Sequence, residues 1–418
     1  MNDTQDTIDS SDSFSPSQHS DTFYFHSNDG DLLAYDAQTQ KQKLYKNIHE
    51  DDLSPDGVCI TPNKEMALSV NSEGQIYQHS LKTDKRFSSL PQAAYRGLYL
   101  CKFTPNGKNF FATNVYGELF EWLYEKEQNQ LSQTNGSNYY TYNQESSFKC
   151  NCHACNTAGR AGQENGAKAH KPPPSTEYAN IQDMVITKDS KWMFAGGGDM
   201  SLFSVNIEQH KVHRRFDEFD TYEDGNCAYK MEMTPDNKYL WVAWDHNAHD
   251  DMGRKGDDSD EDTEWDHADF FGKRDRDAFT RPRSYKPVTF SKYAVVGGDL
   301  SLVKHYYRES YLIAFVVHND GENLYFVDTA GHLMGFDTKT GKESMMCAGL
   351  RKEDWPAPNR PKCCMKMSTD GSDLVIALGK KPIQVWNIKA KKLLKTVKIN
   401  FTVQGIELVK SRFIPQNV

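Results

Sequence analysis

The amino-acid sequence predicts an all-β protein, a single seven-bladed β-propeller closed by its C-terminal strand and interrupted by two long loop insertions. Three observations favour this fold class: a recurring tight-turn phrase, a second recurring phrase built around glycine, and a spare strand near the C-terminal end. The chain has 418 residues, of which 37% are hydrophobic, so one large domain with a packed core is expected.

The tight-turn phrase recurs six times along the chain. Each copy lies between two short apolar segments, and its Pro, Asn, Asp and Gly residues favour tight β-turns. Where no insertion intervenes, neighbouring copies lie about 43 to 50 residues apart, close to the period of a four-stranded propeller blade. The copies begin at Thr61, Thr104, Thr187, Thr234, His318 and Ser368.

The second phrase marks the other half of each repeat. Gly30, Gly74 and Gly331 are each followed two residues later by an apolar residue, and glycine permits a tight reversal between strands. Residues 23–36 and 324–337 align with each other without a gap. The two phrases together predict units of four strands.

The two ends of the chain predict how the ring closes. The first unit starts at Phe23 without an innermost strand, and residues 403–409 form a spare strand after the last complete unit. We expect this strand to complete the blade formed by residues 22–48, because a closed ring leaves no long sheet edge exposed. Residues 1–20 are polar and are expected to form a disordered tail before a propeller over residues 21–418.

These motifs resemble the WD40 family. The segment Gln384-Val-Trp-Asn-Ile is similar to the family's terminal Trp-Asp strand, and the Thr-Pro-Asn and Thr-Pro-Asp turns are similar to its inner-strand turn. The resemblance extends from about residue 21 to the end and implies a binding platform. The sequence departs from the family because only Trp122 and Trp386 hold the tryptophan position and no unit has a clear Gly-His pair. A neighbouring, diverged propeller family is the alternative.

The first insertion, residues 131–178, contains a candidate metal site. Three thiolates and one imidazole could supply the four ligands of a tetrahedral Zn²⁺, and coordination would order a loop that has no core of its own. The alternative is a flexible loop with exposed, reduced thiols. The candidate ligands are Cys150, Cys152, Cys155 and His170. No other cofactor is expected.

The second insertion, residues 246–287, is acidic and then basic. Eight of the thirteen residues in 257–269 are Asp or Glu, which favours a solvated segment. A calcium loop is the alternative, although Thr263 stands where such a loop needs glycine. Exposed serine and threonine residues here are candidate phosphorylation sites. They are Ser259, Thr263 and Ser284.

Aromatic residues in the two insertions are candidate partner-binding residues, because aromatic side chains are favoured anchors of protein interfaces. The alternative is that they pack back onto the propeller. They are Tyr139, Tyr140, Tyr142, Phe148, Trp265, Phe270 and Phe271.

Charge and composition exclude several function classes. The net charge of −9 argues against general nucleic-acid binding, and no apolar run is long enough to span a membrane. The chain starts without a secretory or transit signal, which predicts a cytoplasmic location and reduced cysteines. Four cysteines beside the turns are expected in the core: Cys59, Cys101, Cys227 and Cys364.

The expected function is a protein–protein interaction scaffold or adaptor in a larger intracellular complex, and not an enzyme. The inner strands show few charged groups beyond Lys102, Glu232 and Lys366. The sequence contains neither a nucleophile-elbow motif nor a phosphate-binding glycine loop. The alternatives are a metal- or redox-responsive adaptor that uses the Cys150–Cys155 loop, and a propeller-type hydrolase. A row of lysines on the last outer strand either protects a sheet edge or binds an anionic lipid or acidic partner. These are Lys389, Lys391, Lys392, Lys395 and Lys398.

Overall fold

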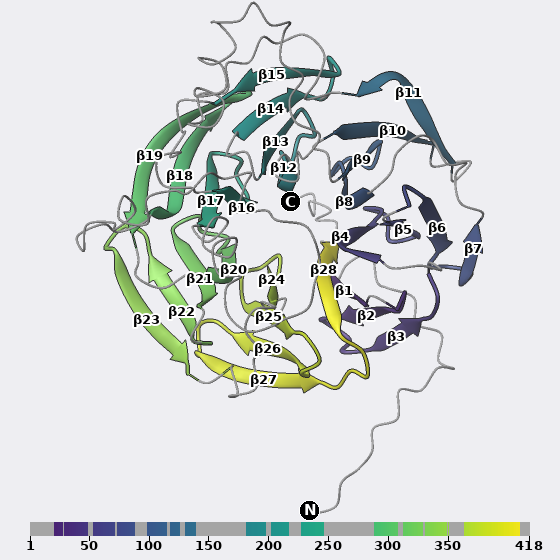
Figure 1. Ribbon diagram of the computed structural model, residues 1–418. Helices are drawn as coiled ribbons and strands as arrows, with labels where there is room; N and C mark the ends of the chain where they lie inside the picture. The colour runs from purple at the N-terminus through teal and green to yellow at the C-terminus, as the bar shows by residue number, and fades with distance from the viewer. Residues whose placement is uncertain are drawn as a thin grey trace, which may run out of the picture.

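The computed structural model contains seven four-stranded antiparallel sheets arranged as the blades of a closed ring (Figure 1). The first strand of each blade lies nearest the ring axis and the fourth lies at the rim. Blades 2 and 3 also share one parallel bridge between their inner strands, at Asp56 and Leu100. The predicted seven-bladed propeller is therefore confirmed.

The structure describes most of the propeller and leaves out the segments between the following ranges. The described residues are 21–27, 29–48, 53–71, 73–87, 98–114, 118–125, 130–138, 181–197, 202–216, 227–245, 288–307, 312–328, 331–348, 350 and 363–409.

The strands of the first four blades are given from the axis outward. Blade 1 is β28 (Val403–Val409), β1 (Thr22–Ser27), β2 (Leu32–Asp36) and β3 (Gln42–Tyr45); blade 2 is β4 (Leu53–Ile60), β5 (Met66–Asn71), β6 (Ile76–Ser80) and β7 (Lys85–Phe87); blade 3 is β8 (Leu98–Phe103), β9 (Asn109–Asn114), β10 (Leu119–Glu125) and β11 (Gln130–Asn138); blade 4 is β12 (Ile181–Ile186), β13 (Trp192–Gly197), β14 (Leu202–Asn206) and β15 (Lys211–Arg215).

The other three blades follow the same order. Blade 5 is β16 (Cys227–Met233), β17 (Tyr239–Asp245), β18 (Val288–Val296) and β19 (Asp299–Tyr307); blade 6 is β20 (Leu312–Val317), β21 (Asn323–Asp328), β22 (Leu333–Asp337) and β23 (Lys342–Cys347); blade 7 is β24 (Cys363–Met367), β25 (Asp373–Leu378), β26 (Ile383–Asn387) and β27 (Lys392–Val397).

The C-terminal strand closes the ring as the sequence predicts. β28 pairs antiparallel with β1, from Thr22 opposite Val409 to Ser27 opposite Val403. Phe401, Val403 and Ile406 join the core cluster that also holds Phe23 and residues of blade 7. Closure therefore stabilises the protein through both backbone pairing and apolar burial.

The six predicted tight turns join the first and second strands of blades 2 to 7. In blade 2 the Thr61 hydroxyl donates to the Asn63 side chain at 2.6 Å and accepts from the Met66 backbone N–H at 3.0 Å. The same pattern recurs at Thr104, Thr187, Thr234 and Ser368. We call the side of the ring that carries these turns the turn face, and the opposite side the loop face.

Neighbouring turns also contact one another around the turn face. The Asn106 backbone donates to the Ser190 hydroxyl at 3.1 Å, and the Lys188 backbone donates to the Asn237 side chain at 3.0 Å. His318 lies 3.2 Å from the carbonyl oxygen of Gly371. These contacts link the inner parts of neighbouring blades on the turn face.

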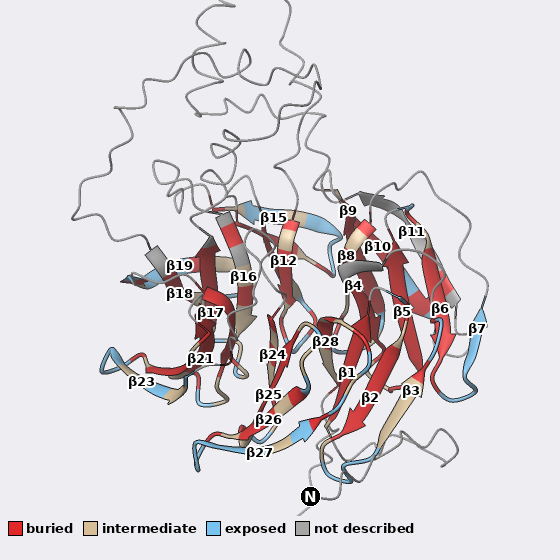
Figure 2. Ribbon diagram, turned by 60° about the horizontal axis from the view of Figure 1, so that its bottom comes forward, coloured by how far each residue is buried: buried red, intermediate tan, exposed pale blue. Residues whose placement is uncertain are grey.

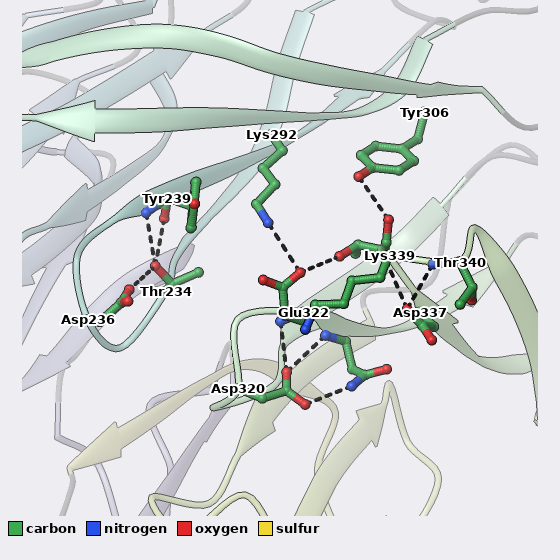
Figure 3. A network of polar contacts seen from close by, with 12 residues as sticks. Thr234, Asp236, Tyr239, Lys292, Tyr306, Asp320, Glu322, Asp337, Lys339 and Thr340 are labelled. Atoms are coloured by element: carbon green, nitrogen blue, oxygen red, sulfur yellow. Dashed lines mark hydrogen bonds and ion pairs between the residues drawn. The ribbon is translucent and has the colours of Figure 1, made fainter.

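A second polar network joins blades 5 and 6 farther out (Figure 3). The Lys292 ammonium is buried, lies 3.5 Å from Glu322 and sits over the Tyr239 ring at 4.1 Å. The Thr338 hydroxyl donates to the same Glu322 carboxylate at 3.0 Å. Glu322 therefore connects a strand of blade 5 with the outer half of blade 6.

Burial is highest in the second and third strands of the blades and lowest at the rim, and several inner strands, such as β12 and β24, are partly half-buried (Figure 2). The second and third strands of the blades are almost fully buried, because each sheet packs between two others, whereas β7, β15, β23 and β27 are mostly exposed or half-buried. The glycine reversals between second and third strands are confirmed at Gly30, Gly74 and Gly331, whose φ angles are 81°, 83° and 78°.

The first insertion begins later than expected. Residues 130–138 form β11, which pairs with β10 as the outer strand of blade 3, so the expectation of a loop from Leu131 is wrong for these residues. Leu131 packs in the core cluster between blades 2 and 3, which explains why this stretch adds a strand. The remainder of that insertion and all of 246–287 lie outside the described residues. The strands that flank both insertions end on the loop face.

Candidate functional site

Charged side chains from three neighbouring inner strands meet in the central channel. Asp183 on β12 lies 3.1 Å from the Lys102 ammonium of β8 and 3.3 Å from the Lys230 ammonium of β16. In each of the three strands the pairing register shifts shortly before the charged residue. The shift lies directly before Asp183 and Lys230, and it ends two residues before Lys102. Such a bulge redirects the side chains that follow it, which explains why these polar groups point away from the apolar packing.

Both carboxylate oxygens of Asp183 are occupied. Oδ1 accepts from Lys102 and from the Met184 backbone N–H at 2.9 Å, and Oδ2 accepts from the Met231 backbone N–H at 2.9 Å and contacts Lys230. The side chain is completely buried, which by itself would raise its pKa, but the lysine charges and the Met231 N–H hold the pKa well below its usual range. Asp183 is therefore a permanent anion that joins blades 3, 4 and 5.

A second charged group lines a pocket where the channel opens on the turn face. Lys366 of β24 lies there with Glu232 of β16 and Glu407 of β28, and the space is about 480 Å³ including its opening to solvent. Glu232 raises the pKa of Lys366 most strongly; burial opposes this shift and Glu407 adds to it. Lys366 therefore stays protonated near neutral pH. The apolar part of the wall comes from Met233, Pro235, Val316, Val317, Met367 and Leu408.

The channel shows both the success and the limit of prediction from sequence. Lys102, Glu232 and Lys366 lie on the inner strands as expected. Asp183, Lys230 and Glu407 were missed, so the expectation that the inner strands carry little further charge is wrong. Asp183 lies near the start of β12, beside the polar residue Gln182, so the local sequence does not mark it as a residue that faces the channel. At Lys230 and Glu407 the available signal was a charged residue flanked by apolar or aromatic residues in an inner strand.

The candidate residues of the insertions stay predictions. The proposed zinc ligands, the seven aromatic residues and the three phosphorylation sites all lie outside the described residues. Within the ranges that the structure covers, no three His, Cys, Asp or Glu side chains are placed to hold a metal ion.

Two of the four cysteines beside the turns are buried as expected. Cys59 and Cys101 are 2% and 0% exposed and share one core cluster, as expected. Cys364 is only half-buried, and its thiol donates to the Gln404 carbonyl oxygen at 3.4 Å. Cys364 therefore contacts the closing strand rather than lying in the core, and Cys227 has no described side chain.

Comparison with known proteins identifies the fold and no family. No protein-family model matches the chain, and no curated protein is similar in sequence. Among solved structures, a "putative 6-phosphogluconolactonase" from Bacteroides fragilis is similar, with a TM-score of 0.55, 12% identity, and coverage of 95% of this chain and 100% of that chain. At this identity the likeness shows a shared propeller fold, and membership of the WD40 family stays a prediction. The described segments contain no helix of the length and apolarity that crossing a membrane requires.

Proposed function

We propose that this propeller is an interaction scaffold or adaptor subunit of a larger cytoplasmic complex. The observation that carries the proposal is the state of Asp183, the most buried charged group of the channel. Its oxygens are occupied by two ammonium groups and two backbone N–H groups. A general acid or base works best with a pKa near the working pH, whereas this carboxylate stays ionised and joins three blades. Its arrangement favours a rigid ring over acid–base chemistry.

The loop face is the proposed partner-binding surface. One insertion connects β11 to β12 and the other connects β17 to β18, so both start and end on this face, on either side of blade 4. Long loops held at fixed points by a rigid ring suit the binding of other proteins. The aromatic residues of the insertions are the proposed anchors.

The size of the native protein in a gentle cell extract tests the proposal. We expect it to migrate well above the 47.8 kDa of the single chain. Shortening residues 140–178 or 247–286 to a short linker should reduce the size of the native complex without lowering the melting temperature, because every strand of the described residues is kept. The control is Lys188→Glu, an exposed substitution on the turn face. Migration of the native protein as a monomer would exclude a stable complex.

A propeller-type hydrolase is the second candidate. The pocket that holds Glu232, Lys366 and Glu407 favours it, because two carboxylates beside an ammonium group can bind and polarise a small polar substrate. The similar Bacteroides protein suggests a phosphorylated sugar lactone as the first substrate to examine. Purified protein should then hydrolyse 6-phosphogluconolactone, and Glu232→Gln should remove the activity while the protein stays folded. Hydrolysis at the rate without enzyme would exclude this substrate.

A further inference from the structure

The outer strands of three consecutive blades form a strongly basic surface on a protein that is acidic overall. We define the basic flank as residues 388–399 of blade 7, 40–46 of blade 1 and 81–87 of blade 2. These segments contain eleven lysine and arginine residues and one acidic residue, Asp84, although the whole chain has a net charge of −9. The corresponding segments of blades 5 and 6, residues 296–307 and 337–347, contain equal numbers of acidic and basic residues.

The three segments form one continuous surface. The Lys395 ammonium of blade 7 lies 3.4 Å from the Gln40 side chain of blade 1, and Lys43 of blade 1 lies 3.7 Å from Asp84 of blade 2. The turns that open the three outer strands lie at the rim of the turn face, and this region is largely exposed (Figure 2). Lys389, Lys391 and Lys392 are all exposed there. A flat, negatively charged surface can therefore contact all three turns together.

Large apolar side chains are exposed among these lysines. Leu393 and Leu394 are 37% and 53% exposed in β27, and Phe87 at the end of β7 is 43% exposed. Leucine and phenylalanine side chains gain free energy when they enter the boundary between lipid headgroups and acyl chains. They gain little from a nucleic-acid backbone, which arginine also recognises better than lysine does. The flank contains ten lysines and one arginine, Arg86.

We propose that the basic flank docks the propeller onto an anionic phospholipid bilayer. Lysine ammonium groups of blades 7, 1 and 2 would contact the headgroups, and Leu393, Leu394 and Phe87 would enter the interface. The acidic remainder of the molecule would then face away from the membrane. This docking goes beyond the scaffold function, because it leaves the loop face free for partner proteins.

Flotation of the full chain with lipid vesicles tests the docking. The protein should bind vesicles of phosphatidylcholine with about 30 mol% phosphatidylserine and should not bind phosphatidylcholine alone. Raising the salt from about 0.1 M to about 0.5 M should release most of it, because salt screens the lysine charges. Equal binding to both vesicles, or to neither, would overturn the proposal.

Blade 6 provides a matched control for the charge. Lys389 and Lys392 occupy the same places in the turn of blade 7 as Lys339 and Lys342 do in blade 6, and all four are exposed. Lys389→Glu with Lys392→Glu should weaken vesicle binding about tenfold or more, whereas Lys339→Glu with Lys342→Glu should leave it within about twofold. An equal loss in both variants would show a response to net charge alone and would overturn the proposal.

The apolar side chains separate a membrane from a nucleic acid. Leu393→Ser with Leu394→Ser should weaken vesicle binding about threefold to tenfold while every lysine is kept. Tighter binding to single-stranded DNA than to the vesicles, unchanged by this variant, would overturn the lipid proposal in favour of a nucleic acid. The size of the native complex in a detergent-free soluble extract is measured separately, so the scaffold and docking proposals can fail independently.

Discussion

The carboxylate of Asp21 accepts two hydrogen bonds from Thr369, a residue 348 positions later in the chain. The Thr369 backbone N–H donates at 2.5 Å and its hydroxyl at 2.6 Å. On the other side, Lys64 of blade 2 donates to the hydroxyl of Thr22 at 3.0 Å. Blade 1 has no turn between its first two strands, because they come from opposite ends of the chain. Asp21 and Thr22 take the place of this turn and complete the ring of contacts on the turn face.

Replacing Asp21 should therefore weaken ring closure. Asp21→Ala removes both acceptors of Thr369, and we expect the free energy of unfolding to fall by about 1–3 kcal/mol in chemical denaturation. Thr369→Val keeps the backbone donor and should therefore lower the free energy of unfolding by less than Asp21→Ala does. The double variant should lower it by less than the sum of the two single losses. As a control, Glu208→Ala at an exposed position should change the free energy of unfolding by no more than about 0.5 kcal/mol. Strict additivity of the first two variants would show that the two residues do not interact in solution.

Removing the closing strand should prevent folding. Deletion of residues 400–418 takes away β28, leaves the edge of β1 unpaired and exposes the core cluster of blades 1 and 7. Circular dichroism and size-exclusion chromatography should show an aggregated or unfolded chain. Deletion of residues 411–418 alone keeps every pair between β1 and β28 and should leave the melting temperature unchanged. A soluble 1–399 fragment that melts cooperatively would contradict the role given to β28.

Neutralising Asp183 should destabilise the ring most near neutral pH. Asp183→Asn leaves Lys102 and Lys230 without their buried counter-charge, which should cost about 3 kcal/mol at pH 7. The folded-state pKa of Asp183 is below its ordinary value of 3.8, so its stabilising contribution is complete above that pH and disappears as the pH falls toward the folded-state pKa. Urea denaturation from pH 7 to pH 3 measures the free energy of unfolding of the native protein and of Asp183→Asn. The difference between the two should become smaller only in the acidic range. A difference in free energy of unfolding that stays constant from pH 7 to pH 3 would exclude the charge of Asp183 as its cause.

Lys64 should also make the free energy of unfolding rise with pH, but in the alkaline range. Burial is the main reason that its pKa falls from 10.5 to about 8, with Asp36 and Asp21 opposing the shift. The unfolded chain keeps this proton to higher pH than the folded protein does, so stability gains from rising pH above about 8. In chemical denaturation, the free energy of unfolding of the native protein should rise by about 1–3 kcal/mol relative to that of Lys64→Met between pH 8 and pH 10. Parallel stability curves for the two proteins would show that Lys64 titrates normally.

Two glycines can separate backbone strain from contact between turns. Gly341 and Gly371 have φ angles of 70° and 75°, but a Cβ on Gly341 would meet nothing within 4 Å, whereas one on Gly371 would lie 2.9 Å from the His318 ring. Gly341→Ala should cost about 1 kcal/mol from its backbone conformation, and Gly371→Ala about 1–2 kcal/mol more. Thermal denaturation measures both. Equal losses would indicate that the turns of blades 6 and 7 are not in tight contact.

The repeat and its closure could be predicted because they depend on local chemistry. The Thr-Pro-Asn and Thr-Pro-Asp phrases encode turns through their own hydroxyl and carbonyl groups, as Thr61 and Asn63 show. The spare strand at 403–409 could be assigned because one blade lacked an inner strand. β11 could not be recognised in the same way, because its sequence Gln-Leu-Ser-Gln-Thr-Asn-Gly-Ser-Asn has little apolar alternation and depends on pairing with β10.

Sequence patterns alone predict the fold class, the six turns, the order of the blades and the strand that closes the ring, because each depends on residues close together in the chain or on counting repeated units. Only the tertiary structure showed that Asp183 meets Lys102 and Lys230, that Asp21 takes the place of a missing turn, and that three lysine-rich strands form one flank. These relationships join residues from different blades. Their distances depend on how the sheets pack around the axis, and no local pattern in the chain specifies that packing.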